Sequence, residues 1–143
     1  MAAKYYNDGA DYRLPAKGKT AVWLRECTEN EGLRLGPVNY IFCSPERHLA
    51  INRQFLGHDY YTDVITFDYS DLTGRRVVSG DVFIDPATVA DNALQLGIDP
   101  VIEMRRVLVH GLLHLCGYGD KTADEERVMR GKEDFYLARF PAV

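Results

Sequence analysis

The spacing of hydrophobic residues alternates along the chain between a repeat of two and a repeat near 3.6, which predicts strands interspersed with helices. Val38, Tyr40 and Phe42 alternate with Asn39, Ile41 and Cys43 in what is predicted to be a half-apolar strand. The stretch Tyr60–Phe67 is rich in β-branched and aromatic residues and is predicted to be a central strand. The predicted strands are Tyr5–Leu14 at an edge, Val38–Cys43 after a break at Gly36-Pro37, Tyr60–Phe67, and Arg76–Ile84, with the last two forming an antiparallel hairpin.

Capping residues, prolines and glycines mark the helix boundaries. Ser44-Pro45, Asp85-Pro86 and Asp99-Pro100 each place a capping side chain before a first-turn proline. Thr122 to Glu125 has the spacing of a capping box. The predicted helices are Ala16–Asn30, Pro45–Gly57, Pro86–Leu96, Pro100–Cys116, and one after Thr122 with Val128, Met129, Phe135, Tyr136 and Phe140 on its apolar side. Residues 1–143 are therefore expected to form one α+β domain of about four strands and several helices, with helix 100–116 across the sheet.

The chemistry of the chain is concentrated near the end of that central helix. His110 and His114 are four residues apart, so an α-helix directs both imidazoles to one point. Gly117 can end the helix in a left-handed turn, and the short link that follows can return Asp120 to the same point. Three protein ligands with a fourth position left for water are typical of catalytic zinc. The pattern predicts a His-His-Asp metal site that acts through a metal-activated water.

Two observations bear on that interpretation. Histidines four apart also arise by chance on helix faces, so the spacing alone leaves ordinary packing as an alternative. The apolar residues around the pair favour burial, however, and a buried imidazole needs a partner for each ring nitrogen. The residue after His110 is Gly111 rather than the glutamate of H-E-x-x-H metalloproteases, which disfavours zinc peptidase chemistry.

Composition narrows the setting. A hydrophobic content of 46% and a charged content of 27% indicate a globular protein. No apolar run reaches the ~20 residues of a membrane span, and the first residues lack the apolar region of a signal peptide, so we expect a cytoplasmic protein without a membrane partner. The three cysteines, Cys27, Cys43 and Cys116, are predicted to be free thiols, with Cys116 in the core. The net charge of −4 argues against broad nucleic-acid binding but allows a local basic surface.

The run H-G-L-L-H-L-x-G-Y at residues 110–118, with a third ligand six residues after the second histidine, resembles the YbeY family of bacterial rRNA-maturation endoribonucleases. The matching segments elsewhere are Ile51-Asn52, Thr62–Phe67, Gly80–Ile84 and Met129. The resemblance implies a mixed sheet with a cleft beside the metal. It also implies a zinc-dependent, single-strand-specific endoribonuclease acting in 3′-end maturation of small-subunit (16S) rRNA and in ribosome quality control. Its partners would be rRNA and the small ribosomal subunit rather than DNA.

The sequence departs from the family pattern in two places. Asp120 stands where a third histidine is usual, and Gly119 precedes it where the family commonly has Asp. Leu56 stands where many members carry a functional arginine. Arg53, one helical turn earlier, is a candidate substitute for that arginine.

Further residues are candidates for roles around the metal. Asp63 and Asp81 are interpreted either as buried acids bonded to a strand end or loop, or as partners of the metal ligands. Tyr118 can stack on a base or fix the loop, and Arg105 and Arg106 are the cations one turn before His110. The candidates for the general base are metal hydroxide alone, Asp81 and Asp85. His48 and His58 are expected to have surface or locally bonded roles.

Three classes of function remain open. The first is the zinc-dependent endoribonuclease. The second is a ribosome-associated binding factor whose metal is mainly structural, which the loss of an arginine at Leu56 favours. The third is a metallopeptidase, which Gly111 disfavours.

Overall fold

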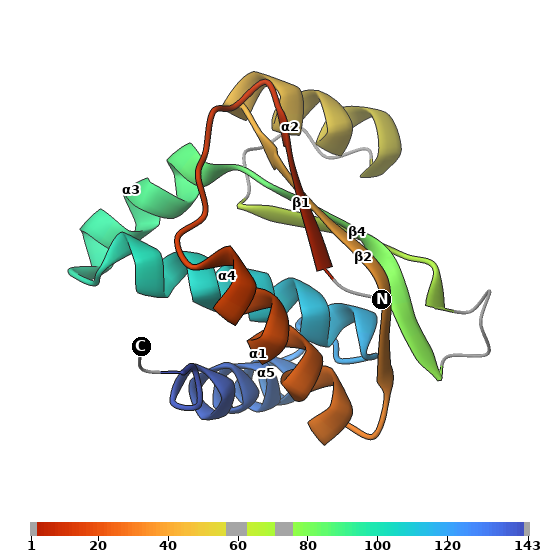
Figure 1. Ribbon diagram of the computed structural model, residues 1–143. Coiled ribbons are helices and arrows are strands. Elements are labelled where there is room, and N and C mark those ends of the chain that lie inside the picture. The colour runs from red at the N-terminus through yellow and green to blue at the C-terminus, as the bar shows by residue number, and fades with distance from the viewer. Residues whose placement is uncertain (1–2, 57–62, 71–75, 142–143) are drawn as a thin grey trace.

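A computed structural model of the chain describes residues 3–56, 63–70 and 76–141 (Figure 1). Its elements in chain order are β1 (Ala3–Asp8), α1 (Lys17–Asn30), β2 (Arg34–Cys43), α2 (Pro45–Ile51), a π-helical turn η1 (Asn52–Leu56), β3 (Val64–Asp68), β4 (Val77–Ile84), α3 (Pro86–Leu96), α4 (Pro100–Leu115) and α5 (Ala123–Leu137). The predicted α+β class is confirmed. None of the helices in these ranges is long and apolar enough to cross a membrane.

The strands form one mixed sheet in the order β1-β2-β4-β3. β1, β2 and β4 are parallel, and β3 pairs antiparallel with β4 as the hairpin prediction required. The prediction of a central strand at Tyr60–Phe67 was wrong, because β3 begins at Val64 and lies at the sheet edge. Its apolar residues pack against helices, with Ile65 buried beside Ile51 of α2, and this packing does not require a strand on each side. The proposed strand start at Tyr60, the helix end at Gly57 and His58 lie outside the described residues.

Two other boundaries differ from expectation. β1 ends at Asp8 instead of continuing to Leu14. β2 starts at Arg34 and passes through Gly36-Pro37, where the register with β4 shifts between Leu35 and Val38. A bulge accommodates a proline because the missing N–H is not needed for pairing there. The Gly-Pro pair therefore bends the strand instead of preceding it.

The caps predicted from the sequence are present. Ser44, Asp85 and Asp99 each accept a hydrogen bond from a backbone N–H in the first turn of their helix, and Thr122 and Glu125 form the capping box. The apolar face of α5 was only partly predicted. Met129 and Tyr136 are buried, whereas Val128 and Phe135 are exposed. Phe140 lies beyond the end of α5 and is half-buried against the main core.

α4 lies across one face of the sheet and contacts β3 and β4, as predicted (Figure 1). α1 packs against β1 and β2 on the same face and also contacts α4, while α3 and α5 pack against α4. The main core fills the space between these elements, and Trp23, Tyr40, Leu108 and Leu112 are almost fully buried in it. A smaller cluster around Cys43, Ile51 and Ile65 joins α2 to the other face. The sheet therefore carries α4 as its central helix.

Two glycines allow α4 to lie close to the sheet. A methyl group on Gly111 would lie 2.8 Å from Cγ1 of Val82 on β4. A methyl group on Gly80 would lie 2.8 Å from Cδ2 of Leu115 and would overlap the carbonyl oxygen of Phe67. Real Cβ atoms essentially never approach so closely, so both positions require the absence of a side chain. Gly111, which stands where H-E-x-x-H metalloproteases have a glutamate, thus has a packing role.

We predict that Gly80→Ala lowers the free energy of unfolding by about 1–3 kcal/mol, because the neighbouring strand backbone must move to make room. Gly131→Ala is the matched control. Gly131 lies within α5, and a methyl group added there would meet no heavy atom within 4 Å, so this change should stabilise the protein by up to about 1 kcal/mol. Denaturant unfolding of both variants measures the difference, and equal effects would contradict the packing argument.

Candidate metal centre

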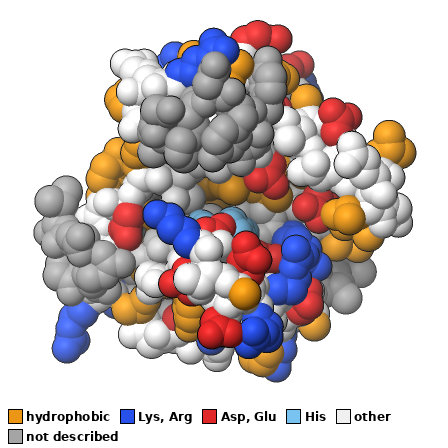
Figure 2. Space-filling view, turned by 180° about the vertical axis from the view of Figure 1, so that it is seen from behind, with side chains coloured by type: hydrophobic (Ala, Val, Ile, Leu, Met, Phe, Trp, Pro, Cys, Tyr) orange, Lys and Arg blue, Asp and Glu red, His pale blue; other side chains and the backbone are white. Residues whose placement is uncertain are grey.

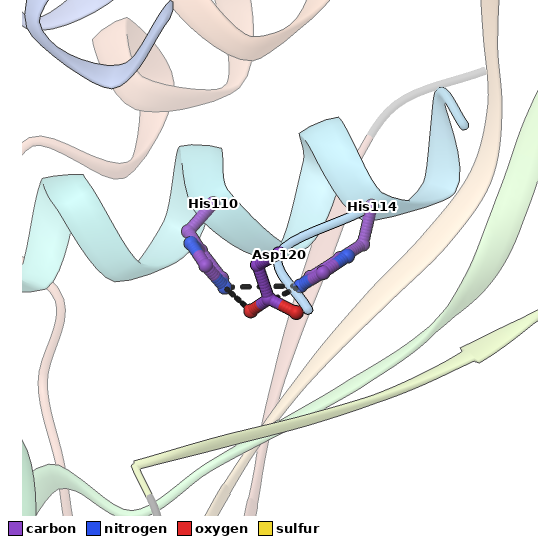
Figure 3. A group of neighbouring side chains, drawn as sticks. All are labelled: His110, His114 and Asp120. Carbon is purple, nitrogen blue, oxygen red and sulfur yellow. Dashed lines mark hydrogen bonds and ion pairs between the residues drawn. The ribbon is translucent and has the colours of Figure 1, made fainter. Parts of the chain in front are cut away.

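His110 and His114 lie one turn apart on α4, and Asp120 reaches them from the following loop (Figure 3). His110 Nε2 and His114 Nε2 are 3.0 Å apart, and Asp120 Oδ2 is 3.2 Å from His114 Nε2 and 3.4 Å from His110 Nε2. The three side chains point toward one another, so the structure brings together the three residues that the sequence predicted as ligands.

The loop that carries Asp120 is shaped by backbone hydrogen bonds after α4. Gly117 has a φ of 110°, in the region that favours glycine, and the Tyr118 N–H donates to the Leu113 carbonyl at 3.0 Å. Glu125, in the capping box of α5, accepts from the N–H of Lys121 at 3.0 Å. The loop is therefore anchored at both ends, which holds Asp120 beside the histidines.

Hydrogen bonds at the Nδ1 atoms determine which nitrogen of each imidazole faces the centre. His114 Nδ1 lies 2.9 Å from the carbonyl oxygen of Tyr118, and His110 Nδ1 lies 2.6 Å from Oε2 of Glu133. A carbonyl oxygen only accepts, so Nδ1 of His114 is the donor and Nε2 is the ring nitrogen that faces the centre. The Glu133 carboxylate imposes the same arrangement on His110. Both Nε2 atoms thus face the Asp120 carboxylate.

This donor set fits a divalent cation. The two Nε2 atoms and the Asp120 carboxylate oxygen lie 3.0–3.4 Å apart, and a cation placed between them could be bound by all three. Ligand atoms around a tetrahedral zinc with bonds of ~2.0–2.1 Å are roughly 3.3–3.4 Å apart, close to these separations. The side chains of His110, His114 and Asp120 are 20%, 22% and 40% exposed, so one side of the group is open. The group can therefore hold a metal ion and leave a position for another ligand.

Glu133 is a partner of the candidate centre that was not predicted from the sequence. Its carboxylate is buried and accepts a 3.0 Å hydrogen bond from Nη1 of Arg106 as well as contacting His110. Burial alone would lower the pKa of His110, but the hydrogen bond and charge of Glu133, with the charges of Asp120 and Asp63, raise it. The signal was present in the sequence, because Met129, Glu133 and Tyr136 follow the i, i+4, i+7 spacing of a buried helix face.

The histidines lie at the floor of a cleft with a volume of ≈ 750 Å³. Figure 2 looks into this hollow and shows histidine surface at its centre with acidic and basic side chains around it. The described residues that line the cleft are Asp63, Val64, Thr66, Arg106, Val107, His110, His114, Asp120, Ala123, Glu126, Arg127, Met129, Arg130 and Glu133. The cleft lies between β3 and the stripe of α5 that faces α4.

The other predicted site residues fall into two groups. Asp63 and Arg106 line the cleft. Arg105 points elsewhere, with its guanidinium carbon 3.7 Å from the centre of the Phe140 ring. Arg53 is exposed on η1 and is not among the described residues that line the cleft, while the side chain of Leu56 lies outside the described part of the chain. Arg105 and Arg106 are adjacent in sequence, but successive residues of a helix point in different directions, so Arg106 lines the cleft and Arg105 does not.

Asp81 and Asp85, the two candidates for the general base, are both used elsewhere. Because Gly80 and Val82 face α4, Asp81 lies on the opposite face of the sheet, where it accepts from Asn39 at 3.0 Å. Asp85 is fully buried and caps α3, accepting 2.7 Å from the Thr88 hydroxyl. Neither carboxylate is among the described residues of the cleft, so the structure offers no support for a role in proton transfer.

Tyr118 joins the metal loop to two helices. Its hydroxyl donates to Oε1 of Glu31 at 2.6 Å, and Glu31 also accepts from Lys132 at 3.0 Å and from the Tyr136 hydroxyl. Burial would raise the pKa of Glu31, but the hydrogen bonds from Tyr118, Tyr136 and Lys132 outweigh it and lower that pKa. Of the two interpretations of Tyr118, its contacts match the one in which it fixes the loop.

The remaining histidine and cysteine predictions concern residues away from the centre. His48 is buried, with Nε2 2.9 Å from the carbonyl oxygen of Phe83, in agreement with a locally bonded role. Cys27, Cys43 and Cys116 are free thiols. Cys116 packs at the edge of the main core, and among the described residues the group able to hold a metal comprises His110, His114 and Asp120 alone.

The group of three candidate ligands has an open side, which is typical of catalytic rather than structural metal centres. The protein belongs to the class of hydrolytic enzymes. Residues 14–141 match the family model described as endoribonuclease YbeY. The chain belongs to this family.

Individual relatives match along almost their whole length. An endoribonuclease YbeY of Parabacteroides distasonis is 46% identical, covering 99% of this chain and 97% of the relative. One from Bacteroides thetaiotaomicron is 45% identical, covering 96% and 98%. The solution structure of TM1509 from Thermotoga maritima is similar with a TM-score of 0.69 and 26% identity, covering 96% of this chain and 88% of that one. The chain thus shares its fold with a solved structure, and its family with relatives matched over almost their whole length.

We predict that Glu31→Gln lowers the free energy of unfolding at pH 7 by about 1–3 kcal/mol, because three donors lose a charged acceptor. The folded-state pKa of Glu31 is lowered, so its stabilising effect is present above the unfolded value of about 4.3 and is lost as pH falls through the lower folded value. Thermal unfolding from pH 7 to pH 3 should show the two proteins converging. Glu29→Gln, at an exposed position on the same helix, is the control. A pH-independent difference would contradict the assignment.

Proposed function

We propose that the protein is a zinc-dependent endoribonuclease of the cytoplasm that cleaves single-stranded RNA. Its setting would be 3′-end maturation of small-subunit rRNA and ribosome quality control, with rRNA and the small ribosomal subunit as partners. The observation that carries the proposal is the His110-His114-Asp120 group on the floor of an open cleft in a chain of the endoribonuclease YbeY family. Coordination by two imidazoles and one carboxylate favours zinc, although nickel, cobalt or manganese can use the same ligands.

His110, His114 and Asp120 would hold the cation. When bound there, the cation would supply Lewis acidity, which activates water for attack and stabilises charge on a phosphoryl oxygen. Glu133 and the Tyr118 carbonyl orient the two imidazoles, so the ligands need little rearrangement on binding. Asp63 lines the cleft without being one of the three ligands, and we assign it contact with the substrate or its water.

The two other classes predict different behaviour. A metallopeptidase of the H-E-x-x-H type needs a glutamate after the first histidine, and the contact between Gly111 and Val82 leaves no room for one. A ribosome-associated factor with a structural metal would bind RNA without cleaving it. Incubating the purified protein with single-stranded RNA and with a peptide, each with and without a chelator, separates all three. Chelator-sensitive RNA cleavage supports the proposal, and RNA binding without cleavage contradicts it.

His114→Ala is predicted to abolish stoichiometric metal binding, because a single imidazole and a carboxylate remain. We expect about one divalent ion per chain in the unmodified protein and RNA cleavage that disappears with it. Elemental analysis of the purified proteins measures the metal, and circular dichroism checks that the variant is folded. Full metal content in the double variant His110→Ala/His114→Ala would rule out this site.

Asp120→His should keep metal binding and leave the fold intact, since imidazole and carboxylate both coordinate zinc at ~2.0–2.2 Å. The longer side chain requires a small shift of the loop after Gly117. Asp120→Asn should bind the metal more weakly, and Asp124→Asn, at an exposed position on α5, should not change affinity. Competition with a fluorescent chelator measures all three. If Asp120→His lost the metal while Asp120→Asn retained it, Asp120 would not be a ligand.

A further inference from the structure

Three arginines line the described part of the cleft, Arg106, Arg127 and Arg130, together with four carboxylates. The carboxylates are Asp63, Asp120, Glu126 and Glu133. Three positive and four negative side chains give this surface a net negative charge, which is unfavourable for binding a polyanion. A bound divalent cation would make the net charge only slightly positive. The proposed RNA substrate therefore depends on which arginines are available to contact phosphate.

Arg106 is held by ion pairs with carboxylates of the protein itself. Its Nη1 lies 3.0 Å from both Glu133 Oε1 and Asp134 Oδ1, and its Nε lies 3.7 Å from Glu103 Oε1. The side chain is only 20% exposed. Moving Arg106 to a phosphate would leave the buried carboxylate of Glu133 without its cation, which is costly. Arg106 positions Glu133 and is not free to bind a ligand.

Arg127 lies at the rim of the cleft and has one ion-pair partner. It forms a 2.8 Å ion pair with Asp124, one turn earlier on α5, and the two side chains are 73% and 85% exposed. Such exposed pairs contribute little to stability. The nearby Asp124 carboxylate nevertheless offsets the charge of Arg127, so Arg127 contributes weakly to attraction of a phosphate.

Arg130 differs from both. Within the described residues it makes no hydrogen bond or close ion pair, although it lines a cleft that contains four carboxylates, and its charge acts at longer range on Glu103, whose pKa it lowers against the effect of burial. It follows Glu126 by four residues and precedes Glu133 by three, so it shares the cleft-facing stripe of α5 with the carboxylate that contacts His110. The exposed Arg130 side chain thus lines the same cleft as His110, His114 and Asp120.

We propose that Arg130 is the phosphate-binding residue of this cleft, with its guanidinium donating to the nonbridging oxygens of the RNA phosphate that lies over the His110-His114-Asp120 group. The proposal rests on the proposed function. A guanidinium presents paired N–H donors that match two phosphate oxygens, so it both fixes the phosphate and balances charge as the phosphate is attacked. Arg130 contributes to orientation and rate more than to overall affinity.

The test compares Arg130→Ala and Arg130→Lys with Arg25→Ala, which removes the same charge from an exposed position of α1 outside the cleft. Arg130→Ala should lower kcat/KM for single-stranded RNA by roughly 10-fold or more, mainly through kcat. Arg130→Lys should restore part of the loss, since it keeps the charge without the fork. Arg25→Ala should behave as the unmodified protein. Metal content and melting temperature, measured on each protein, show that neither site nor fold is damaged.

Binding of a labelled single-stranded RNA, measured by anisotropy before cleavage proceeds, gives a second readout. Removing one phosphate contact should reduce the slope of log affinity against log salt by roughly 0.7. If the unmodified protein cleaves RNA and Arg130→Ala matches it in kcat/KM and salt slope, the role of Arg130 is wrong and the proposed function stands. If no protein cleaves RNA, the proposed function fails, and the change in salt slope alone supports or overturns phosphate binding by Arg130.

Discussion

The contact between α4 and the sheet at Gly111 determines where the chemistry of this protein can take place. With no side chain at this position, Val82 and Thr66 approach the helix backbone directly, and the residues before and after Gly111 are fixed in direction. His110 is one of those neighbours, and His114 follows one turn later. Because Gly111 faces the sheet, the imidazoles of His110 and His114 point into the cleft beside β3. The same close contact between Gly111 and Val82 explains why a glutamate cannot follow His110 here.

Charge compensation extends outward from the histidines through a series of buried or half-buried partners. Glu133 contacts His110, Arg106 contacts Glu133, and Glu103 lies beside Arg106. Burial raises the pKa of Glu103, while Arg106 opposes that effect. Burying such charges is favourable only when each is paired, so the series behaves as a unit. It gives α5 a role in the centre although α5 supplies none of the three candidate ligands.

Local patterns predicted a large part of this structure. The caps at Ser44, Asp85 and Asp99, the hairpin, the helix that carries the histidines and the turn at Gly117 all depend on residues close in sequence, and each was predicted. The edge position of β3 was not predictable, because apolar content reports burial and does not report neighbours in the sheet. The two arginines before His110 could not be told apart from the sequence, since Arg106 lines the cleft whereas its neighbour Arg105 faces Phe140. Glu133 was missed because its importance comes from a contact between two helices.

The network around Glu31 has a consequence for the order in which the centre is completed. Glu31 follows α1, Tyr118 belongs to the metal loop, and Lys132 and Tyr136 belong to α5, so the loop is secured only when these three segments meet. Glu133 also reaches His110 from α5. The supports of the centre therefore come together only when α5 docks on α1 and α4. Local opening of this last helix would release the metal loop and His110 together, while the sheet and α4 stayed folded.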